Sequence, residues 1–152
     1  MKLISACLVG INCKYNGKNN LEDLSSEIYK EYKEGNLIPV CPEQLGGLPT
    51  PRPAAQIQKD SGEEVLEGRA KIKTESGQDV SAYFLKGARE VVKIAEELGI
   101  KEAILKQRSP SCGCGEIYDG TFSKTIKKGS GVTATLLKKK GVKIYTEEDF
   151  VS

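Results

Sequence analysis

The sequence predicts a single-domain α/β protein with a three-layer, Rossmann-like fold, in which helices cover both faces of a mostly parallel sheet. Short apolar segments alternate along the chain with longer segments whose apolar residues recur every three or four positions. The 152 residues are enough to bury one hydrophobic core, and no internal repeat divides them. We therefore expect residues 1–152 to form one domain.

The first third of the chain alternates strands and a helix. Residues 2–9, KLISACLV, are apolar and predict a buried strand that ends at a glycine. Residues 21–34 carry apolar side chains at helical spacing and predict a helix. Residues 36–43, NLIPVCPE, predict a second strand. The stretch that follows, QLGGLPTPRPAAQ, holds two glycines and three prolines and predicts a loop.

The rest of the chain continues the alternation. Residues 63–75 are compatible with a hairpin or with a short helix, and RAKIKT within them is compatible with an edge strand. Residues 80–98 carry one apolar stripe up to Gly99 and predict a long helix. The remaining predicted elements are a strand at 102–107, a helix at 131–140 capped by Ser130, a strand at 142–146 and a helical turn at 146–150.

Composition excludes several classes of function. The chain has no histidine, which excludes histidine-based acid–base catalysis, Cys–His nucleophiles and metal sites with imidazole ligands. The net charge of +2 does not predict binding to a nucleic-acid polymer, and no apolar run approaches the ~18 residues of a membrane span. The apolar stretch after Met1 is too short for a signal peptide, so we expect a cytoplasmic protein. Five cysteines, an odd number, argue against a framework of structural disulfides.

Three of the five cysteines lie at or just beyond the carboxyl ends of predicted strands: Cys7, Cys41 and Cys112. In a parallel sheet, ligands bind in the crevice outside these ends, so we expect the three thiols to meet at one edge. Loops rich in proline, glycine and serine surround Cys41 and Cys112, which is unusual for a cysteine that only packs in a core. Cys7 lies within an apolar strand, and packing alone explains it equally well.

The residues leave three kinds of site open. Scattered thiolates can hold an iron–sulfur cluster. They can also bind zinc without histidine, as in a zinc-thiolate module, or carry sulfur. Alternatively, Cys112 and Cys114 can act as a C-x-C pair in a thiol-disulfide enzyme. The spacing of the cysteines does not decide among the three.

Three blocks of the sequence resemble the signature of the thiouracil desulfidase (TudS) family of bacteria and archaea, formerly catalogued as a domain of unknown function. The blocks are SACLVGINCKYNG, PVCPEQLGGLPTPR and LKQRSPSCG, they occur in the family's order, and the resemblance covers nearly all of residues 1–145. It implies a 4Fe–4S cluster held by only three cysteines, whose fourth iron takes sulfur from a thiolated nucleobase. The implied ligands are Cys7, Cys41 and Cys112, with Cys13 as the substitute.

The resemblance also implies the reaction, a non-redox desulfidation of a small thiolated pyrimidine in which thiouracil and water give uracil and hydrosulfide. Adding water to the ring requires a general base, and without histidine Glu43 is the best-placed group, two residues after Cys41. The assisting serine of the family corresponds to Ser111 or Ser109. An iron that lacks a protein ligand is open to oxidants, so we expect purification in air to yield protein without its cluster.

Four further residues are candidates for binding the substrate. We expect the GGLPTPR loop, with Gly46 and Gly47, to close over it, because the glycines allow close approach and the prolines limit disorder. Arg52 and Lys106 can donate hydrogen bonds to a pyrimidine carbonyl or to the anionic cluster. The glycine-rich stretch KKGSGVTA is compatible with an anion site at the start of a helix.

Overall fold

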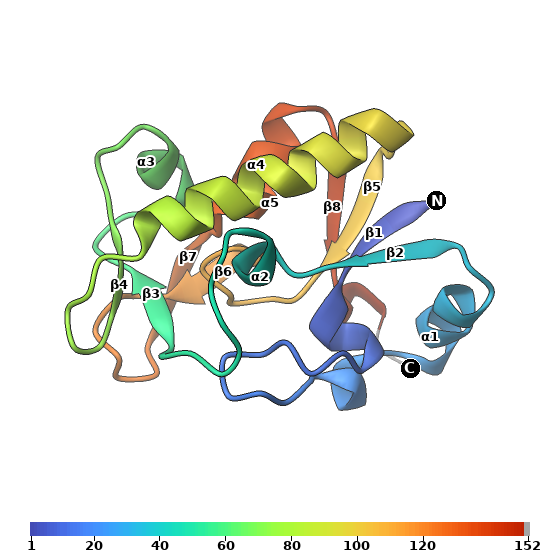
Figure 1. Cartoon of the computed structure of the whole chain (residues 1–152), viewed down its shortest axis with the longest axis horizontal. Helices are drawn as coiled ribbons and strands as arrows, with labels where there is room; N and C mark the ends of the chain where they lie inside the picture. The colour runs from blue at the N-terminus through green and yellow to red at the C-terminus, as the bar shows by residue number, and fades with distance from the viewer. Residues whose placement is uncertain (151–152) are drawn as a thin grey trace.

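A four-stranded parallel sheet forms the centre of the protein in the computed structural model, which describes residues 1–150 (Figure 1). The remaining two residues of the expected domain, 151–152, lie outside the described residues. The strands are β1 (Lys2–Ser5), β2 (Leu37–Val40), β5 (Glu102–Leu105) and β8 (Lys143–Thr146), in the spatial order β2-β1-β5-β8. All neighbours in this sheet pair in parallel, so the predicted α/β class with a mostly parallel sheet is confirmed.

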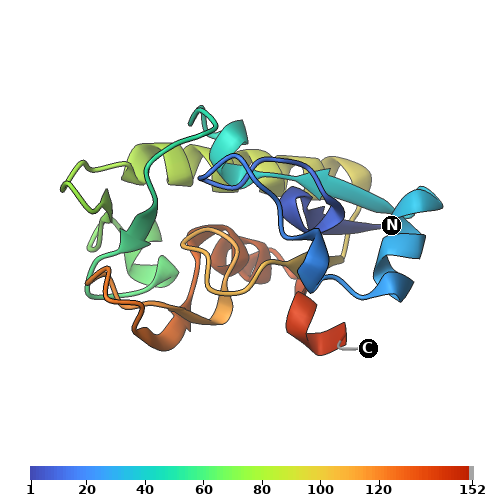
Figure 2. The ribbon, with the colours of Figure 1, turned by 90° about the horizontal axis from the view of Figure 1, so that it is seen from below.

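Helices pack on both faces of this sheet. Alternate residues of β1 point to opposite faces, and the neighbours Leu3 and Ile4 therefore enter different hydrophobic clusters. Leu3 packs with the long helix α4 (Ser81–Leu98), which runs along most of the molecule in both views (Figures 1 and 2), and with α5 (Val132–Lys139). Ile4 packs with α1 (Ser26–Lys33) on the other face.

Two antiparallel strand pairs lie at the end of the molecule opposite α1 (Figure 1). They are β3 (Ala55–Ile57) with β4 (Ile72–Thr74), and β6 (Cys114–Tyr118) with β7 (Ile126–Ser130). A separate hydrophobic cluster joins them to α4, α5 and the short helix α3 (Gly62–Leu66). The sequence did not predict the β6–β7 hairpin, because within β6 only Ile117 is buried and the strands lack an apolar alternation.

Both predicted N-terminal strands are shorter than expected. β1 ends at Ser5, and the rest of the predicted strand forms a 3-10 turn, η1 (Ala6–Val9). β2 ends at Val40, because Pro42 starts a short helix, α2 (Pro42–Leu45). Proline suits the first position of a helix, where its missing N–H has no partner to lose. The cysteines of both segments therefore follow their strands.

The other predictions in the first half need similar corrections. Residues 21–34 form a short 3-10 turn, η2 (Leu21–Asp23), and then α1, which begins late because the Ser25 hydroxyl caps it by accepting the Ile28 N–H at 3.3 Å. The loop predicted after β2 contains the second half of α2 and the start of β3. Residues 63–75 contain both a short helix, most of α3, and a strand, β4.

The C-terminal half follows its prediction more closely. The helix predicted at 80–98 is confirmed as α4, and the strands predicted at 102–107 and 142–146 are confirmed as β5 and β8. The final turn η3 (Glu147–Phe150) is confirmed too, with the Glu148 N–H bound to the Thr146 hydroxyl at 3.2 Å. Ser130 does not cap α5, because Gly131 occupies the cap position and Ser130 ends β7. Within residues 1–150, no helix combines the length and apolarity that crossing a membrane requires.

Candidate active site

A cavity of about 810 Å³ lies between the carboxyl ends of the parallel strands and the two antiparallel pairs. The segments after β1, β2 and β5 form one part of its wall. Strand β3, the end of β4 and the β6–β7 hairpin form another part. The cavity is thus where ligands bind in parallel sheets. Four of the five cysteines line it: Cys7, Cys13, Cys41 and Cys112.

Cys7 lies in the turn that follows β1. Gly10 ends this turn with a φ of 95°, in the left-handed region that a glycine adopts without strain. The chain then folds back, because the Asn20 N–H donates to the Cys7 carbonyl at 2.8 Å. The Asn20 side chain also contacts the Cys7 thiol. This return loop places Cys13 on the same cavity as Cys7.

Cys41 and Glu43 reach the cavity from helix α2. Cys41 is the N-cap of the helix, and Glu43 lies in its first turn. The backbone of α2 packs directly on α4, where a methyl group added at Gly46 would overlap the Tyr83 carbonyl and one added at Gly87 would overlap the Pro42 carbonyl. These two glycines therefore allow α2 to pack this closely against α4. Gly46 faces α4, whereas Gly47 lines the cavity.

The loop after β5 is attached to the N-terminus of α5. The N–H groups of Val132 and Thr133 donate to the carbonyls of Pro110 and Ser111 at 2.9 and 2.8 Å. The loop thereby satisfies N–H groups that a helix leaves free at its start, so these groups are not available for an anion. A side chain at Gly131 would overlap the Ser111 carbonyl. With its carbonyls turned to α5, the loop presents Cys112 to the cavity.

Cys13 and Cys112 are buried, Cys7 and Cys41 are half-buried, and three of these four thiols resist ionisation. Burial raises the pKa of Cys7 from 9.0 to about 11, and burial also raises the pKa of the Cys112 thiol. The Cys41 thiol donates to the Cys13 carbonyl at 3.8 Å, and the interaction between the two neighbouring thiols raises the pKa of Cys13 and lowers the pKa of Cys41. Cluster ligands are thiolates, so this donor set fits a group such as an iron–sulfur cluster, whose iron supplies the missing positive charge.

The arrangement of the thiols also bears on the kind of metal site. Among residues 1–150, no three Cys, Asp or Glu side chains surround a common point as ligands of a single ion. A 4Fe–4S cluster binds each cysteine through a different iron, so thiols spread around the wall of a cavity can hold it.

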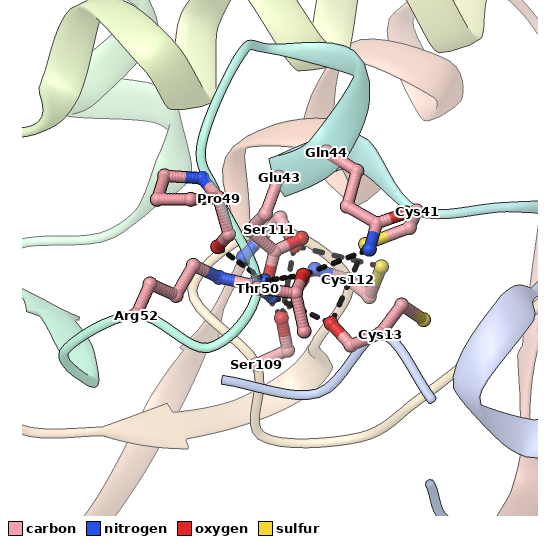
Figure 3. Close-up of polar contacts among 10 residues, drawn as sticks. All are labelled: Cys13, Cys41, Glu43, Gln44, Pro49, Thr50, Arg52, Ser109, Ser111 and Cys112. Carbon is pink, nitrogen blue, oxygen red and sulfur yellow. Dashed lines mark hydrogen bonds and ion pairs between the residues drawn. The ribbon is translucent and has the colours of Figure 1, made fainter. Parts of the chain in front are cut away.

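Glu43 lies at the centre of a polar network beside the thiols (Figure 3). Its Oε1 accepts the Ser111 hydroxyl at 2.8 Å, and its Oε2 lies 3.7 Å from Nη2 of Arg52. The Ser111 hydroxyl also lies 3.6 Å from the Cys112 sulfur and 2.9 Å from the Ser109 hydroxyl. Ser109 and Glu43 line the cavity, and Ser111 is fully buried between them. The network joins the carboxylate to the wall that carries Cys112.

Arg52 fastens three parts of the wall together. Its Nη2 donates to the Cys13 carbonyl at 2.9 Å, and its Nη1 donates to the Thr50 hydroxyl at 3.0 Å. Its backbone N–H donates to the Tyr15 carbonyl at 2.7 Å. Only 6% of the Arg52 side chain is exposed, and Glu43 is the acidic group beside it. The cavity wall at this point depends on one guanidinium group.

Lys106 lines the cavity on the side of β5. Its Nζ lies 2.9 Å from Oε2 of Glu147, and its backbone N–H donates to the Ser5 hydroxyl at 2.9 Å. Ser5 in turn contacts the Cys112 thiol. Sequence reasoning did not single out Ser5 or Glu147. The sequence feature that could have marked them is their position, because Ser5 ends β1 and Glu147 directly follows β8.

Cys114 lies apart from the other cysteines. It starts β6, packs partly against the core beneath α4 and α5, and is not among the residues lining the cavity. Its N–H donates to Oε1 of Gln107 at 2.8 Å. The structure therefore brings Cys112 to the cavity and leaves Cys114 outside it.

Sequence reasoning also missed the aromatic part of the wall, which consists of Tyr15, Tyr83, Phe84, Tyr118 and Phe122.

Comparisons with known proteins agree with this geometry. A sequence model of the family described as 2-thiouracil desulfurase matches residues 3–149. The uncharacterized protein YbbK of Bacillus subtilis (strain 168) is 46% identical over 149 residues, which cover 98% of this chain and 97% of that protein. A solved structure described as the 4Fe–4S-dependent thiouracil desulfidase TudS (DUF523Vcz) has a TM-score of 0.86 and 38% identity, over 98% of this chain and 91% of the other. The chain therefore belongs to the 2-thiouracil desulfurase family, and its family and structural neighbour mark it as a desulfidase enzyme.

Proposed function

We propose that the protein hydrolyses the C=S bond of a small thiolated pyrimidine such as thiouracil and releases uracil and hydrosulfide, using a 4Fe–4S cluster held by three cysteines. One observation carries the proposal: thiols from three strand ends line the same cavity as Glu43, whose Oε1 accepts the Ser111 hydroxyl. The cavity of about 810 Å³ readily admits a pyrimidine. The family match and the 4Fe–4S-dependent neighbour support the same reaction.

The proposed cluster ligands are Cys7, Cys41 and Cys112. Each lies on a segment that follows a different strand of the parallel sheet, so the three approach a bound cluster from separate directions. Cys13 is the substitute, since it also lines the cavity and contacts Cys41. When bound, the cluster supplies a soft Lewis-acidic iron without a protein ligand, suited to thiocarbonyl sulfur.

Glu43 is the proposed general base. Its carboxylate takes a proton from the water whose oxygen bonds to the ring carbon that carries sulfur. As the water oxygen bonds to this carbon, the π pair of the C=S bond moves to sulfur. The second proton of that water passes to sulfur as the ring carbonyl forms, and the remaining C–S bond breaks with its electron pair leaving on hydrosulfide. No net electron transfer occurs. Ser111 and Arg52 hold the two carboxylate oxygens, so the base is already oriented when substrate arrives.

The pyrimidine itself is proposed to bind through the remaining polar groups of the wall. Lys106 carries three ammonium protons, and Glu147 and the Gln107 carbonyl accept from it at 2.9 and 3.4 Å, which leaves a donor for a ring carbonyl. Arg52 borders the same space, and Gly47 allows the loop after α2 to approach the ring. The aromatic part of the wall offers flat surfaces for the planar substrate.

An iron and labile-sulfide assay on protein prepared and reconstituted without oxygen tests the proposal. We expect close to four irons and four sulfides for each chain, and release of hydrosulfide from 2-thiouracil by that preparation. Cys41→Ser should lose both the iron and the turnover. Cys114→Ser is the matched control and should keep both, because Cys114 does not line the cavity. Protein that binds no iron under these conditions would contradict the proposal.

A further inference from the structure

Three side chains form a row of hydrogen bonds between the segments that follow β2 and β5 (Figure 3). The Ser109 and Ser111 hydroxyl oxygens lie 2.9 Å apart, and the Ser111 hydroxyl lies 2.8 Å from Oε1 of Glu43. Either serine could donate to the other on distance alone. The direction matters, because a hydroxyl has one proton and can offer it to only one acceptor.

The backbone decides this direction. The Ser109 hydroxyl oxygen accepts the N–H groups of both Ser111 and Cys112, each at 3.1 Å. These two bonds use both of its lone pairs, so the Ser109 proton is left to donate to Ser111. An ionised Glu43 only accepts, so the single Ser111 proton goes to the carboxylate. Both requirements are met by one arrangement, in which Ser109 donates to Ser111 and Ser111 donates to Glu43.

A competing orientation exists for the Ser111 proton. The Cys112 sulfur lies 3.6 Å from the Ser111 hydroxyl and is a second acceptor within reach. A donor on Ser111 strengthens the bond that Ser111 itself donates, because chained hydrogen bonds polarise one another. The bond to the carboxylate oxygen at 2.8 Å gains more from this polarisation than the bond to sulfur at 3.6 Å, so the Ser109 proton favours the orientation toward Glu43.

We propose that Ser109 is a positioning residue, whose proton sets the direction of the Ser111 hydroxyl and thereby the orientation of the Glu43 carboxylate. This rests on the proposed function for the role of Glu43, but not for the direction of the hydrogen bonds. Ser109 acts through Ser111 rather than on the substrate, although it borders the cavity. The role requires both of its abilities, accepting two N–H groups and donating one proton.

Two substitutions of nearly equal shape separate these abilities. In Ser109→Asn, the side-chain oxygen can accept the two N–H groups and the amide nitrogen can donate to Ser111. In Ser109→Asp the acceptor remains but the donor is lost, so the Ser111 proton turns toward the new carboxylate. We expect the Asn variant to keep kcat within a few-fold. The Asp variant should lose on the order of 10- to 100-fold in kcat with little change in KM.

Repeating the pair in a Ser111→Ala background separates the effect of the added charge, which persists there, from the effect that passes through Ser111. If Ser109 acts through Ser111, the ratio of kcat between the Asn and Asp variants falls in that background to the part that the charge alone causes. A ratio that persists unchanged there, or a ratio near one when Ser111 is present, would overturn the proposal. Iron content and thermal unfolding of each variant show that the loop and the cluster are intact.

Neutron diffraction from crystals of the deuterated, cluster-loaded protein shows the direction of these hydrogen bonds without any measurement of turnover. We expect the deuteron of Ser109 to point to the Ser111 oxygen and that of Ser111 to point to Oε1 of Glu43. A Ser111 deuteron that points to Ser109 would disprove the positioning role. An inactive wild-type protein that shows the expected deuterons would instead count against the proposed function alone.

Discussion

At Glu43 the two carboxylate oxygens have different partners, a neutral hydroxyl donor on one side and a guanidinium charge on the other. Glu43→Gln keeps the shape of the side chain and an oxygen for the Ser111 hydroxyl, but the amide cannot take a proton from water. We expect kcat to fall by about 10²- to 10⁴-fold while iron content stays unchanged. Steady-state release of hydrosulfide, with iron analysis of the same samples, measures both quantities. Glu97→Gln, at an exposed position of α4, is the control and should match wild type.

Four thiols line the cavity, and the proposed cluster requires three of them. We expect Cys13→Ser to keep its iron and Cys7→Ser to lose it, because Cys13 shares the side of Cys41 whereas Cys7 approaches from a separate strand. Iron analysis and the visible spectrum after reconstitution without oxygen distinguish the two variants. The opposite pattern, iron lost in Cys13→Ser and kept in Cys7→Ser, would exchange the roles of these cysteines.

Arg52 donates to the Cys13 carbonyl and to the Thr50 hydroxyl from two different nitrogens. Lysine keeps the charge but has a single nitrogen, which cannot span both acceptors. Arg52→Lys should therefore destabilise the protein by about 1–3 kcal/mol, the cost of leaving a buried acceptor unpaired. It should also release iron faster to a chelator, because the Cys13 loop is loosened. Chemical denaturation and chelation kinetics test this, with the exposed Arg89→Lys as the control. Equal stability of Arg52→Lys and Arg89→Lys would show that the two hydrogen bonds of Arg52 contribute little to the free energy of unfolding.

At the scale of elements, the helix pair α2 and α4 fixes where Cys41 and Glu43 stand. Gly87 lies in the middle of α4, where alanine would normally stabilise a helix by about 0.5–1 kcal/mol. Here the added methyl group would overlap the Pro42 carbonyl, and overpacking of this kind costs about 1–3 kcal/mol. We therefore expect Gly87→Ala to lower the free energy of unfolding and to displace α2, with loss of turnover. Thermal unfolding and kcat measure both effects. The exposed Lys86→Ala in the same turn should stay close to wild type.

The same elements show how far local patterns predict this fold. The apolar stripe of α4 and the short apolar strands of the sheet were predictable, because burial of one face leaves a periodic pattern in the sequence. The β6–β7 hairpin was not, since only Ile117 of β6 is buried. Gly131 suggested an anion site, but its N–H donates to the Gly113 carbonyl at 2.7 Å. The loop after β5 accepts the N–H groups at the start of α5, and no local sequence pattern encodes a contact between such distant segments.

At the scale of the whole molecule, the cavity combines two kinds of wall. Parallel strands deliver the segments with Cys7, Cys41 and Cys112 to one edge, which the general rule for ligand sites in parallel sheets predicts from the sequence. The opposite wall comes from two antiparallel pairs that depend on contacts distant in sequence. Gln56 of β3, for example, accepts the Gly120 N–H at 3.0 Å from the hairpin loop. The sequence therefore predicted the edge of the sheet at which the three cysteine segments lie, but not the surface that faces them.

Because the thiols come from separate segments, a bound cluster should add a further link between parts of the chain that Glu43, Ser111 and Arg52 already connect. We expect amide hydrogen exchange to slow on cluster loading in residues 6–14, 41–48 and 108–113, which carry the cavity thiols, and to stay unchanged in α1, which contributes no residue to the cavity wall. Thermal unfolding should shift upward in the same samples. Exchange measured by mass spectrometry on cluster-free and reconstituted protein, both kept without oxygen, makes the comparison. If protection rises equally in α1, loading stabilises the whole fold rather than the cavity segments. If it rises in none of the three segments, the cluster does not bind to these thiols.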